Sequence, residues 1–321
     1  MNDFVSKMFA NAISRRGLCT SLGLLIAGSA LPASALEAMA DENAGQRSIA
    51  HELGTTEISG KPGRIVALEF SFVQALDALG VAPVGITDDN QPQRIDQLLG
   101  KHIDYSSVGT RLEPNLELVS ALTPDLIVAD LTRHSAIYPQ LSAIAPTIVL
   151  NSWEGSYQVI KDSVVVIADA LGEKGKGAQA IADHEAAIAA LIAAIPAGEK
   201  RRFLLAVASS DSMSLHTSSS FTGSVFKAMG LMPAIDSSDP VESGAGLERL
   251  IAVNPDVLLV ATDAGGTVLD QWKGNSAFTN ISAVKAGTIF EVDRNQFSRF
   301  RGLKTAEMIG REILAKVYNA G

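Results

Sequence analysis

The chain has 321 residues, of which 47% are hydrophobic and 19% are charged, a composition that forms a core and excludes a disordered chain. This length suffices for two domains or for one large domain. With 26 basic and 35 acidic residues the formal net charge is −9, which argues against a nucleic-acid-binding protein, because such proteins carry a basic balance or stripe.

Residues 1–40 have the pattern of a cleavable export signal. Residues 15–16 are twin arginines, and they precede an apolar stretch over residues 18–30 that is rich in serine and glycine. Small-x-small triplets follow, so cleavage is expected after Ala35 or after Ala40. The alternative is a transmembrane anchor, for which the apolar stretch is short. The arginine pair also indicates the twin-arginine export route.

The only cysteine, Cys19, lies inside this signal. It has no apolar run before it, so it does not fit the lipid-modified cysteine of a lipoprotein. The mature chain is therefore expected to contain no disulfide, no thiol nucleophile and no zinc–cysteine site.

The first part of the mature chain alternates strands and helices. The continuous apolar run at 64–70 is typical of a strand buried on both faces, and Gly80 is a helix stop. In chain order we expect a polar stretch (41–63), a strand (64–70), a helix (71–80), a strand (81–87), a loop (106–111), a helix and strand (116–129) and a closing strand (145–150). Such alternation predicts a parallel sheet with right-handed crossovers.

One phrase occurs twice. Residues 116–129 read LELVSALTPDLIVA, and residues 247–260 read LERLIAVNPDVLLV, so the two copies are in register at a constant offset. In each, a Leu-Glu pair opens a helix-spaced run, a Pro-Asp ends it, and a strand-like run follows. A fixed register over the whole phrase indicates two lobes built on one plan.

Residues 154–198 have helical spacing with a break near residues 172–177. The first part, about 19 residues, would span roughly 28 Å. After it the alternation resumes with a strand (203–209), a helix (223–230), the second copy of the repeat, a strand (287–293) and a terminal helix (about 302–318). The predicted fold is α/β, with lobes at 41–153 and 199–321 bridged by a long helix.

Enzyme motifs are missing from the sequence. The stretch GEKGKGAQ at 172–179 lacks the spacing of a phosphate-binding loop, and no G-x-S-x-G, H-E-x-x-H or post-strand G-x-G-x-x-G occurs. The five histidines are scattered, so a polyhistidine metal site is not expected. An exported enzyme of doubly wound fold stays open as an alternative, but no motif supports it.

Polar side chains gather just after the predicted strands, where parallel sheets place their ligand crevice. Any single arginine there is more often ordinary surface charge. Four arginines with hydroxyls beside them favour an anion site. The candidate residues are Arg111, Arg133, Arg299 and Arg301, together with Ser71, His134, Ser218, Ser219 and Thr222.

Six segments carry a resemblance to a known family: 64–90, 107–134, 144–146, 215–225, 246–261 and 298–307. With them the chain resembles the periplasmic substrate-binding proteins of the siderophore and cobalamin class, and within that class those that take iron(III) dicitrate. The resemblance implies two Rossmann-like lobes with parallel sheets, joined by one long rigid α-helix. It also implies a monomer in the periplasm that captures an iron(III) chelate between its lobes, without catalysis, and delivers it to the permease subunits of an ABC importer in the inner membrane.

The resemblance also assigns roles within the crevice. Citrate already saturates the iron, so the protein is expected to supply no metal ligand and to need no cofactor. Arginines would bind the carboxylates, the hydroxyls would donate hydrogen bonds, and Phe221 or Trp153 would form a wall. His134 either contacts the ligand or caps its loop, and Glu69 is expected to orient an arginine.

Glu117 and Glu248 occupy matching positions of the repeat. The resemblance implies that each docks to arginines of one importer subunit, whereas a simpler interpretation is that each stabilises the first turn of its helix. Rival ligands in the same fold are another siderophore, haem or cobalamin, and the aromatic content of 5% is a weak argument against flat aromatic ligands.

Overall fold

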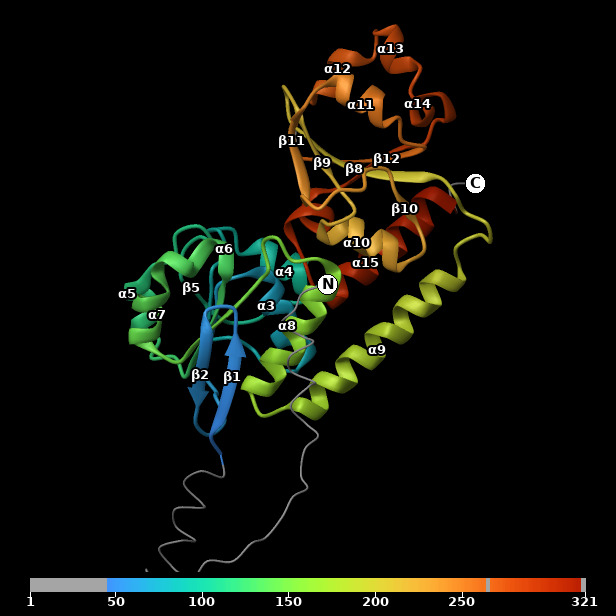
Figure 1. Cartoon of the computed structure of the whole chain (residues 1–321). Coiled ribbons are helices and arrows are strands. Elements are labelled where there is room, and N and C mark those ends of the chain that lie inside the picture. Colours follow the sequence, from blue (N-terminus) through green and yellow to red (C-terminus); the bar gives the residue numbers. More distant parts are fainter. Residues whose placement is uncertain (1–44, 264–265, 319–321) are drawn as a thin grey trace, which may run out of the picture. The chain divides into compact units, whose positions relative to one another are not determined.

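The computed structural model describes residues 45–263 and 266–318 (Figure 1). The predicted export signal and Cys19 lie outside these residues. Within the described ranges, no helix is both long enough and apolar enough to cross a membrane.

The first lobe contains a five-stranded sheet in which all neighbouring strands are parallel, as the sequence predicted. Alternate residues of its central strands face two apolar layers, with α5 and α7 on one face and α3 and α8 on the other (Figure 1). In sheet order the strands are β5 (Ser106–Ser107), β4 (Gly85–Ile86), β3 (Ile65–Ala67), β6 (Leu126–Asp130) and β7 (Thr147–Leu150). The helices are α3 (Phe70–Ala78), α4 (Gln93–Leu99), α5 (Leu116–Ala121), α6 (Leu131–His134) and α7 (Tyr138–Ile144), with a 3₁₀ turn at Ser135–Ile137.

An antiparallel hairpin, β1 (Arg47–His51) and β2 (Gly54–Ile58), occupies the stretch that the sequence indicated only as polar. Only a few of its side chains, including Ile49 and Ile58, are buried, so the hydrophobic signal was weak. The Thr56 hydroxyl donates to the Thr147 carbonyl at 2.8 Å and thereby ties the hairpin to β7.

The second lobe has a mixed sheet, which the sequence predicted as parallel. Strands β8, β10, β12 and β13 pair in parallel, but β9 runs antiparallel to both of its neighbours, β8 and β11. Only residues 209–212 connect β8 to β9, and a parallel connection needs a crossover of a dozen residues or so. The strands are β8 (Arg202–Ala208), β9 (Met213–His216), β10 (Met232–Pro233), β11 (Val241–Ala245), β12 (Val257–Thr262) and β13 (Ile289–Asp293). The helices are α10 (Phe221–Ala228), α11 (Leu247–Val253), α12 (Val268–Trp272), α13 (Ser276–Thr279), α14 (Ser282–Ala286) and α15 (Leu303–Ile313), with π-helical turns at Asn295–Arg299 and Leu314–Tyr318.

The lobes are bridged by a pair of helices, α8 (Tyr157–Ala170) and α9 (Lys174–Ala193), joined by a tight turn. The two-lobe α/β class is confirmed, but the bridge is this helix hairpin and its longer member is the second, at 20 residues. Tyr157 of α8 belongs to the core of the second lobe and Val164 to the core of the first. A Cβ on Gly177 would lie 2.5 Å from the Cβ of Ala168, so glycine is what lets the two helices pack this closely.

The two copies of the repeat, 116–129 and 247–260, form the same local structure in each lobe. The Asp125 carboxylate accepts hydrogen bonds from the backbone N–H groups of Gly63 and Arg64, both at 2.9 Å, and Asp256 accepts one from Arg202 at 2.8 Å. In each lobe the same arginine also donates to carbonyls at the end of the repeat helix. The Pro-Asp therefore joins the end of a helix to the start of a neighbouring strand.

Replacing Asp125 by alanine is expected to reduce the free energy of unfolding by about 1–3 kcal/mol, because two backbone amides lose a charged acceptor. Urea denaturation measures this loss, and ligand affinity should not change, since this local structure is remote from the crevice residues. An unfolding midpoint equal to that of the unaltered protein would contradict the assignment.

Candidate functional site

Two of the four predicted arginines lie over one indole ring, and a third lies over a neighbouring phenylalanine. Arg133, in α6, has its Cζ 4.1 Å from the centroid of the Trp153 ring, and Arg301, just before α15, has its Cζ 5.2 Å from the same ring. Arg111 lies over the Phe70 ring at 3.9 Å. Arg111 and Arg301 are buried and the side chain of Arg133 is 8% exposed, whereas Trp153 is 44% exposed. We call Arg111, Arg133 and Arg301 the arginine cluster.

Glu69, at the N-cap of α3, is the acidic partner of this cluster. It is 1% exposed, forms an ion pair with Arg133, and lies 3.4 Å from Nη1 of Arg111. Its carboxylate therefore lies where it can orient two arginines, the role that the sequence suggested for it.

Asp89 is a second partner of Arg111, and the sequence analysis missed it. It accepts hydrogen bonds from Nη2 of Arg111 at 2.7 Å and from the Arg111 backbone N–H at 3.0 Å, and it also pairs with Arg94. Burial raises the pKa of Asp89, but the hydrogen bonds and charge of Arg111 outweigh this and hold it below its ordinary value. Asp89 fixes the loop and the side chain of Arg111 together.

Asp130, at the end of β6, organises the other half of the cluster and was also missed. Its Oδ1 accepts from the Arg133 backbone N–H at 2.9 Å, and its Oδ2 accepts from those of Ser152 and Trp153 at 2.8 and 2.9 Å. The carboxylate is fully buried. The sequence did contain a signal: Asp130 is the one acidic residue in the strand Leu126–Asp130, and it ends an otherwise apolar run.

His134 is fully buried, and both of its ring nitrogens are occupied. Nδ1 accepts from the Asp130 backbone N–H at 2.9 Å, and Nε2 donates to the Arg111 carbonyl at 2.8 Å. Of the two roles left open by the sequence, this geometry fits the loop cap and leaves no ring nitrogen for a ligand. The neutral tautomer is required, and burial lowers the pKa of His134 below its ordinary 6.5.

His134 is expected to make stability depend on pH. Because its pKa is lowered in the folded state, the unfolded chain binds more protons just below pH 6.5, so this contribution is complete above pH 6.5 and is lost on acidification. A His134→Gln variant should lose this part of the slope, at most about 1.4 kcal/mol per pH unit. Denaturation at a series of pH values measures it, and identical slopes in the two proteins would contradict the tautomer assignment.

The predicted hydroxyl donors are engaged within the protein. Ser218 donates to the Asp236 carboxylate, Ser219 to the Ser237 carbonyl, and Thr222 to the Phe297 carbonyl at 2.6 Å. Likewise, Ser71 shares a hydrogen bond of 2.7 Å with Ser152. Because these protons already have acceptors, the hydroxyls hold loops in place. Their partners are distant in the chain and could not be predicted from the sequence.

Phe221 and Arg299 have partners of their own, and the Arg299 carbonyl accepts a hydrogen bond from Nη1 of Arg301 at 3.3 Å. Phe221 is 5% exposed and packs edge-on against Tyr157 in the core of the second lobe, so only Trp153 is placed to form a wall. Arg299 is bound in a bidentate ion pair with Asp263, at 2.9 and 3.0 Å. Asp263 also pairs with Arg294, so two guanidinium groups share this one carboxylate.

The electrostatics of the cluster favour a bound anion. Burial, and then the charge of Arg301, lower the pKa of Arg133 to about 10, and burial, and then the charge of Arg111, lower that of Arg301 to about 10. Among the residues that the structure describes, Arg301 has no carboxylate within ion-pair distance. Both guanidinium groups stay charged at neutral pH, and a ligand that brings negative charge relieves their repulsion.

His216, at the end of β9, is a further member of this region. Burial and the charge of Arg301 lower the pKa of His216 to about 3, so the ring is neutral at physiological pH. Its Nδ1 is buried and has no hydrogen-bond partner in the described part of the chain. His216 was not among the binding residues predicted from the sequence.

The described residues contain no group of three or more histidine, cysteine, aspartate or glutamate side chains placed to hold a metal ion. A cavity of about 430 Å³ lies elsewhere in the second lobe, lined by α12, α13, β12 and β13, and it does not include the cluster. The chemistry that the cluster can perform is recognition of carboxylates by guanidinium groups.

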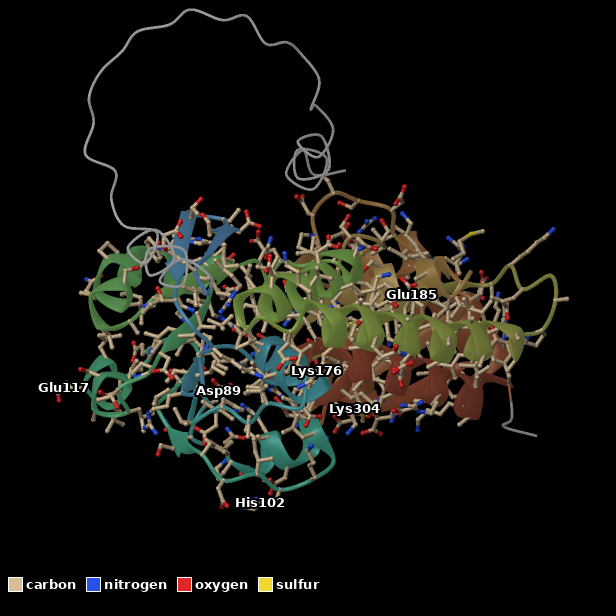
Figure 2. All side chains as sticks on the ribbon, turned by 90° about the horizontal axis from the view of Figure 1, so that it is seen from below. Asp89, His102, Glu117, Lys176, Glu185 and Lys304 are labelled. Atoms are coloured by element: carbon tan, nitrogen blue, oxygen red, sulfur yellow. The ribbon has the colours of Figure 1, made fainter. Side chains whose placement is uncertain are left out.

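Glu117 and Glu248 are both exposed, in the first turns of α5 and α11. Figure 2 shows Glu117 at the outer edge of the first lobe, projecting away from the ribbon. Neither carboxylate forms an ion pair with another described residue. Both are therefore available to an external partner.

Comparison with known proteins places the chain in a family. The family model described as periplasmic binding protein matches residues 65–295. The Fe(3+)-citrate-binding protein YfmC of Bacillus subtilis (strain 168) is 45% identical over 278 residues, covering 87% of this chain and 88% of the relative. The Fe(3+) dicitrate-binding periplasmic protein FecB of Escherichia coli (strain K12) is 35% identical over 269 residues, covering 83% and 89%.

Among solved structures, Staphylococcus aureus SirA complexed with staphyloferrin B superimposes with a TM-score of 0.74 at 25% identity, covering 84% of this chain and 98% of that one. The names of the relatives describe binding proteins and no enzymes, and they include periplasmic proteins and lipoproteins, which supports a location outside the cytoplasmic membrane. The chain belongs to the periplasmic binding protein family.

Proposed function

We propose that this protein captures an anionic iron(III) chelate, iron(III) dicitrate, between its lobes and delivers it to an ABC importer. The observation that carries the proposal is the pair of buried arginines on the Trp153 ring, Arg133 and Arg301, the second of which lacks a carboxylate partner among the described residues. Arg111 completes the cluster. The names of the relatives YfmC and FecB supply the specific chelate.

The chemistry of the chelate matches the cluster. Iron(III) is the cargo, and its hard oxygen ligands come from citrate, so the protein has only to recognise the outer carboxylates. Guanidinium forks bind carboxylates in a bidentate fashion, and burial strengthens each such contact. The aromatic face of Trp153 holds the two guanidinium planes before the ligand arrives.

Tryptophan fluorescence tests the proposal. Trp153 contacts both arginines, whereas Trp272 packs against Phe278 in the second lobe, so a Trp272→Phe variant reports from Trp153 alone. Saturable quenching by iron(III)–citrate at submicromolar concentration is expected, with weaker responses to iron-free citrate, a ferric catecholate, haem and cobalamin. If any other member of this panel binds more tightly, the assignment of iron(III)–citrate as the ligand is wrong.

Docking to the importer is the second part of the proposal. Glu117 and Glu248 are exposed, lie at equivalent positions of the two repeat copies, and carry a charge suited to arginines on two permease subunits. One glutamate on each lobe lets the importer contact both lobes of the same molecule.

We further propose that the chain reaches the periplasm by the twin-arginine route, as residues 15–16 indicate. Lysine at both positions should block export of the folded protein. Undiminished export of that variant would assign the chain to the general secretory route.

A further inference from the structure

The segment that carries Arg301 belongs to the second lobe by sequence but packs into the first. Phe300 and Leu303 are members of the first lobe's core, and the Phe300 ring meets the Phe70 ring edge-on at 5.6 Å. Further along α15, Ile309 and Ile313 belong to the core of the second lobe. The N-terminal turn of α15 is thus anchored in one lobe and its C-terminal half in the other.

Gln74, on α3 of the first lobe, is the polar part of this anchor. Its Oε1 accepts from the Thr305 backbone N–H at 3.2 Å, and its Nε2 donates to the Thr305 hydroxyl at 2.9 Å and to the Leu98 carbonyl at 3.2 Å. Gln74 and Thr305 are 4% and 1% exposed. Thr305 lies in the first turn of α15, where backbone N–H groups have no partner inside the helix.

Gln74 therefore caps a helix of the other lobe. The N-cap residue of α15 is Gly302, which has no side chain with which to cap its own helix. Its φ of 154° lies in the range that favours glycine, and a Cβ there would be 1.9 Å from Oε1 of Gln74. Glycine at 302 is what permits the Gln74 amide to reach the helix end.

Arg301 directly precedes Gly302. The contact between Gln74 and the start of α15 therefore determines where the Arg301 guanidinium lies. Arg111 stacks on Phe70, whose ring packs against Phe300, the residue before Arg301. All three members of the arginine cluster are thereby fixed to the first lobe. The site is assembled before ligand arrives, which reduces the ordering that binding requires.

We infer that Gln74 is a positioning residue for chelate binding: by capping α15 across the lobe boundary it holds Arg301 beside Trp153. This inference rests on the proposed function for its ligand, but the placement of Arg301 can be measured without one.

A double-mutant cycle tests the inference with iron(III)–citrate as the probe. Gln74→Leu, which keeps the volume and removes the cap, should weaken binding about tenfold in the unaltered protein and less than about twofold in the Arg301→Ala background. Gly302→Ala should behave in the same way. Tyr157→Phe is the matched control, because it also removes a buried hydrogen bond between bridging elements, to His184 at 2.6 Å, but should leave affinity unchanged. Equal losses from Gln74→Leu in both backgrounds would overturn the inference.

A second measurement needs no ligand. In a Trp272→Phe background, quenching of Trp153 fluorescence by acrylamide should increase at least about twofold when Gln74 is replaced by leucine, because the ring loses the Arg301 cover. Unchanged quenching would overturn the positioning role even if the chelate binds. Increased quenching in a protein that does not bind iron(III)–citrate would support the positioning role while rejecting the proposed ligand.

Discussion

Replacing Arg301 by alanine is expected to weaken iron(III)–citrate binding by about 2–5 kcal/mol, or ~30-fold to several-thousand-fold. The reason is that Arg301 is buried, has no carboxylate partner among the described residues, and shares the Trp153 ring with Arg133. The ligand carboxylates would therefore be its ionic partners. The fluorescence titration measures the loss of affinity.

Two comparisons make the Arg301 result specific. Arg301→Lys should recover only part of the affinity, since an ammonium group cannot make the bidentate contact. Arg201→Ala removes an arginine that pairs with Glu199 at 2.6 Å, away from the cluster, and should leave affinity unchanged. If Arg301→Ala binds with wild-type affinity, the assignment of the arginine cluster as the ligand site is wrong.

Reversing both docking charges, Glu117→Arg together with Glu248→Arg, is expected to abolish iron(III)–citrate import by reconstituted importer while the affinity for the chelate stays unchanged. Both carboxylates are exposed and free of ion pairs within the described residues, so the folded protein should tolerate the change. On the docking proposal, a cationic surface would then face arginines of the permease, and like-charge contact costs several kcal/mol.

Glu52→Arg together with Glu57→Arg provides the matched control. These two glutamates are exposed on the β1–β2 hairpin, and the change in net charge is the same. Import should be close to normal in this variant. Normal import in the Glu117/Glu248 variant, or a loss of chelate affinity in it, would contradict the docking assignment.

The apolar patterns of the sequence were sufficient for the two-lobe α/β class. The runs at 64–70 and 203–209 became the central strands β3 and β8, because a strand buried on both faces shows a continuous hydrophobic signal. The antiparallel β9 and the β1–β2 hairpin gave weak signals, since they are short or only partly buried. The break in helical spacing near residues 172–177 marks the turn between α8 and α9, although the bridge was predicted as one long helix.

The candidate site was predicted in part. Positions after strands pointed to Arg111, Arg133 and Arg301, because parallel strands end at one edge of a sheet. The serines and threonine, by contrast, were chosen for chemistry alone, and their protons go to acceptors that are distant in sequence, such as the Phe297 carbonyl for Thr222. Asp89 and Asp130 escaped notice for the same reason: a carboxylate that organises loops is recognised only by its partners.

The sequence by itself determined the two-lobe plan, the repeat and the arginines available for an anion, since hydrophobic period and residue chemistry are local properties. Only the tertiary structure decided which of these arginines has no carboxylate partner among the described residues. Asp263 pairs with Arg299, Glu69 and Asp89 hold Arg111, and Gln74 fixes the helix that follows Arg301. Pairing depends on distances between side chains far apart in the chain, and these distances exist only after folding.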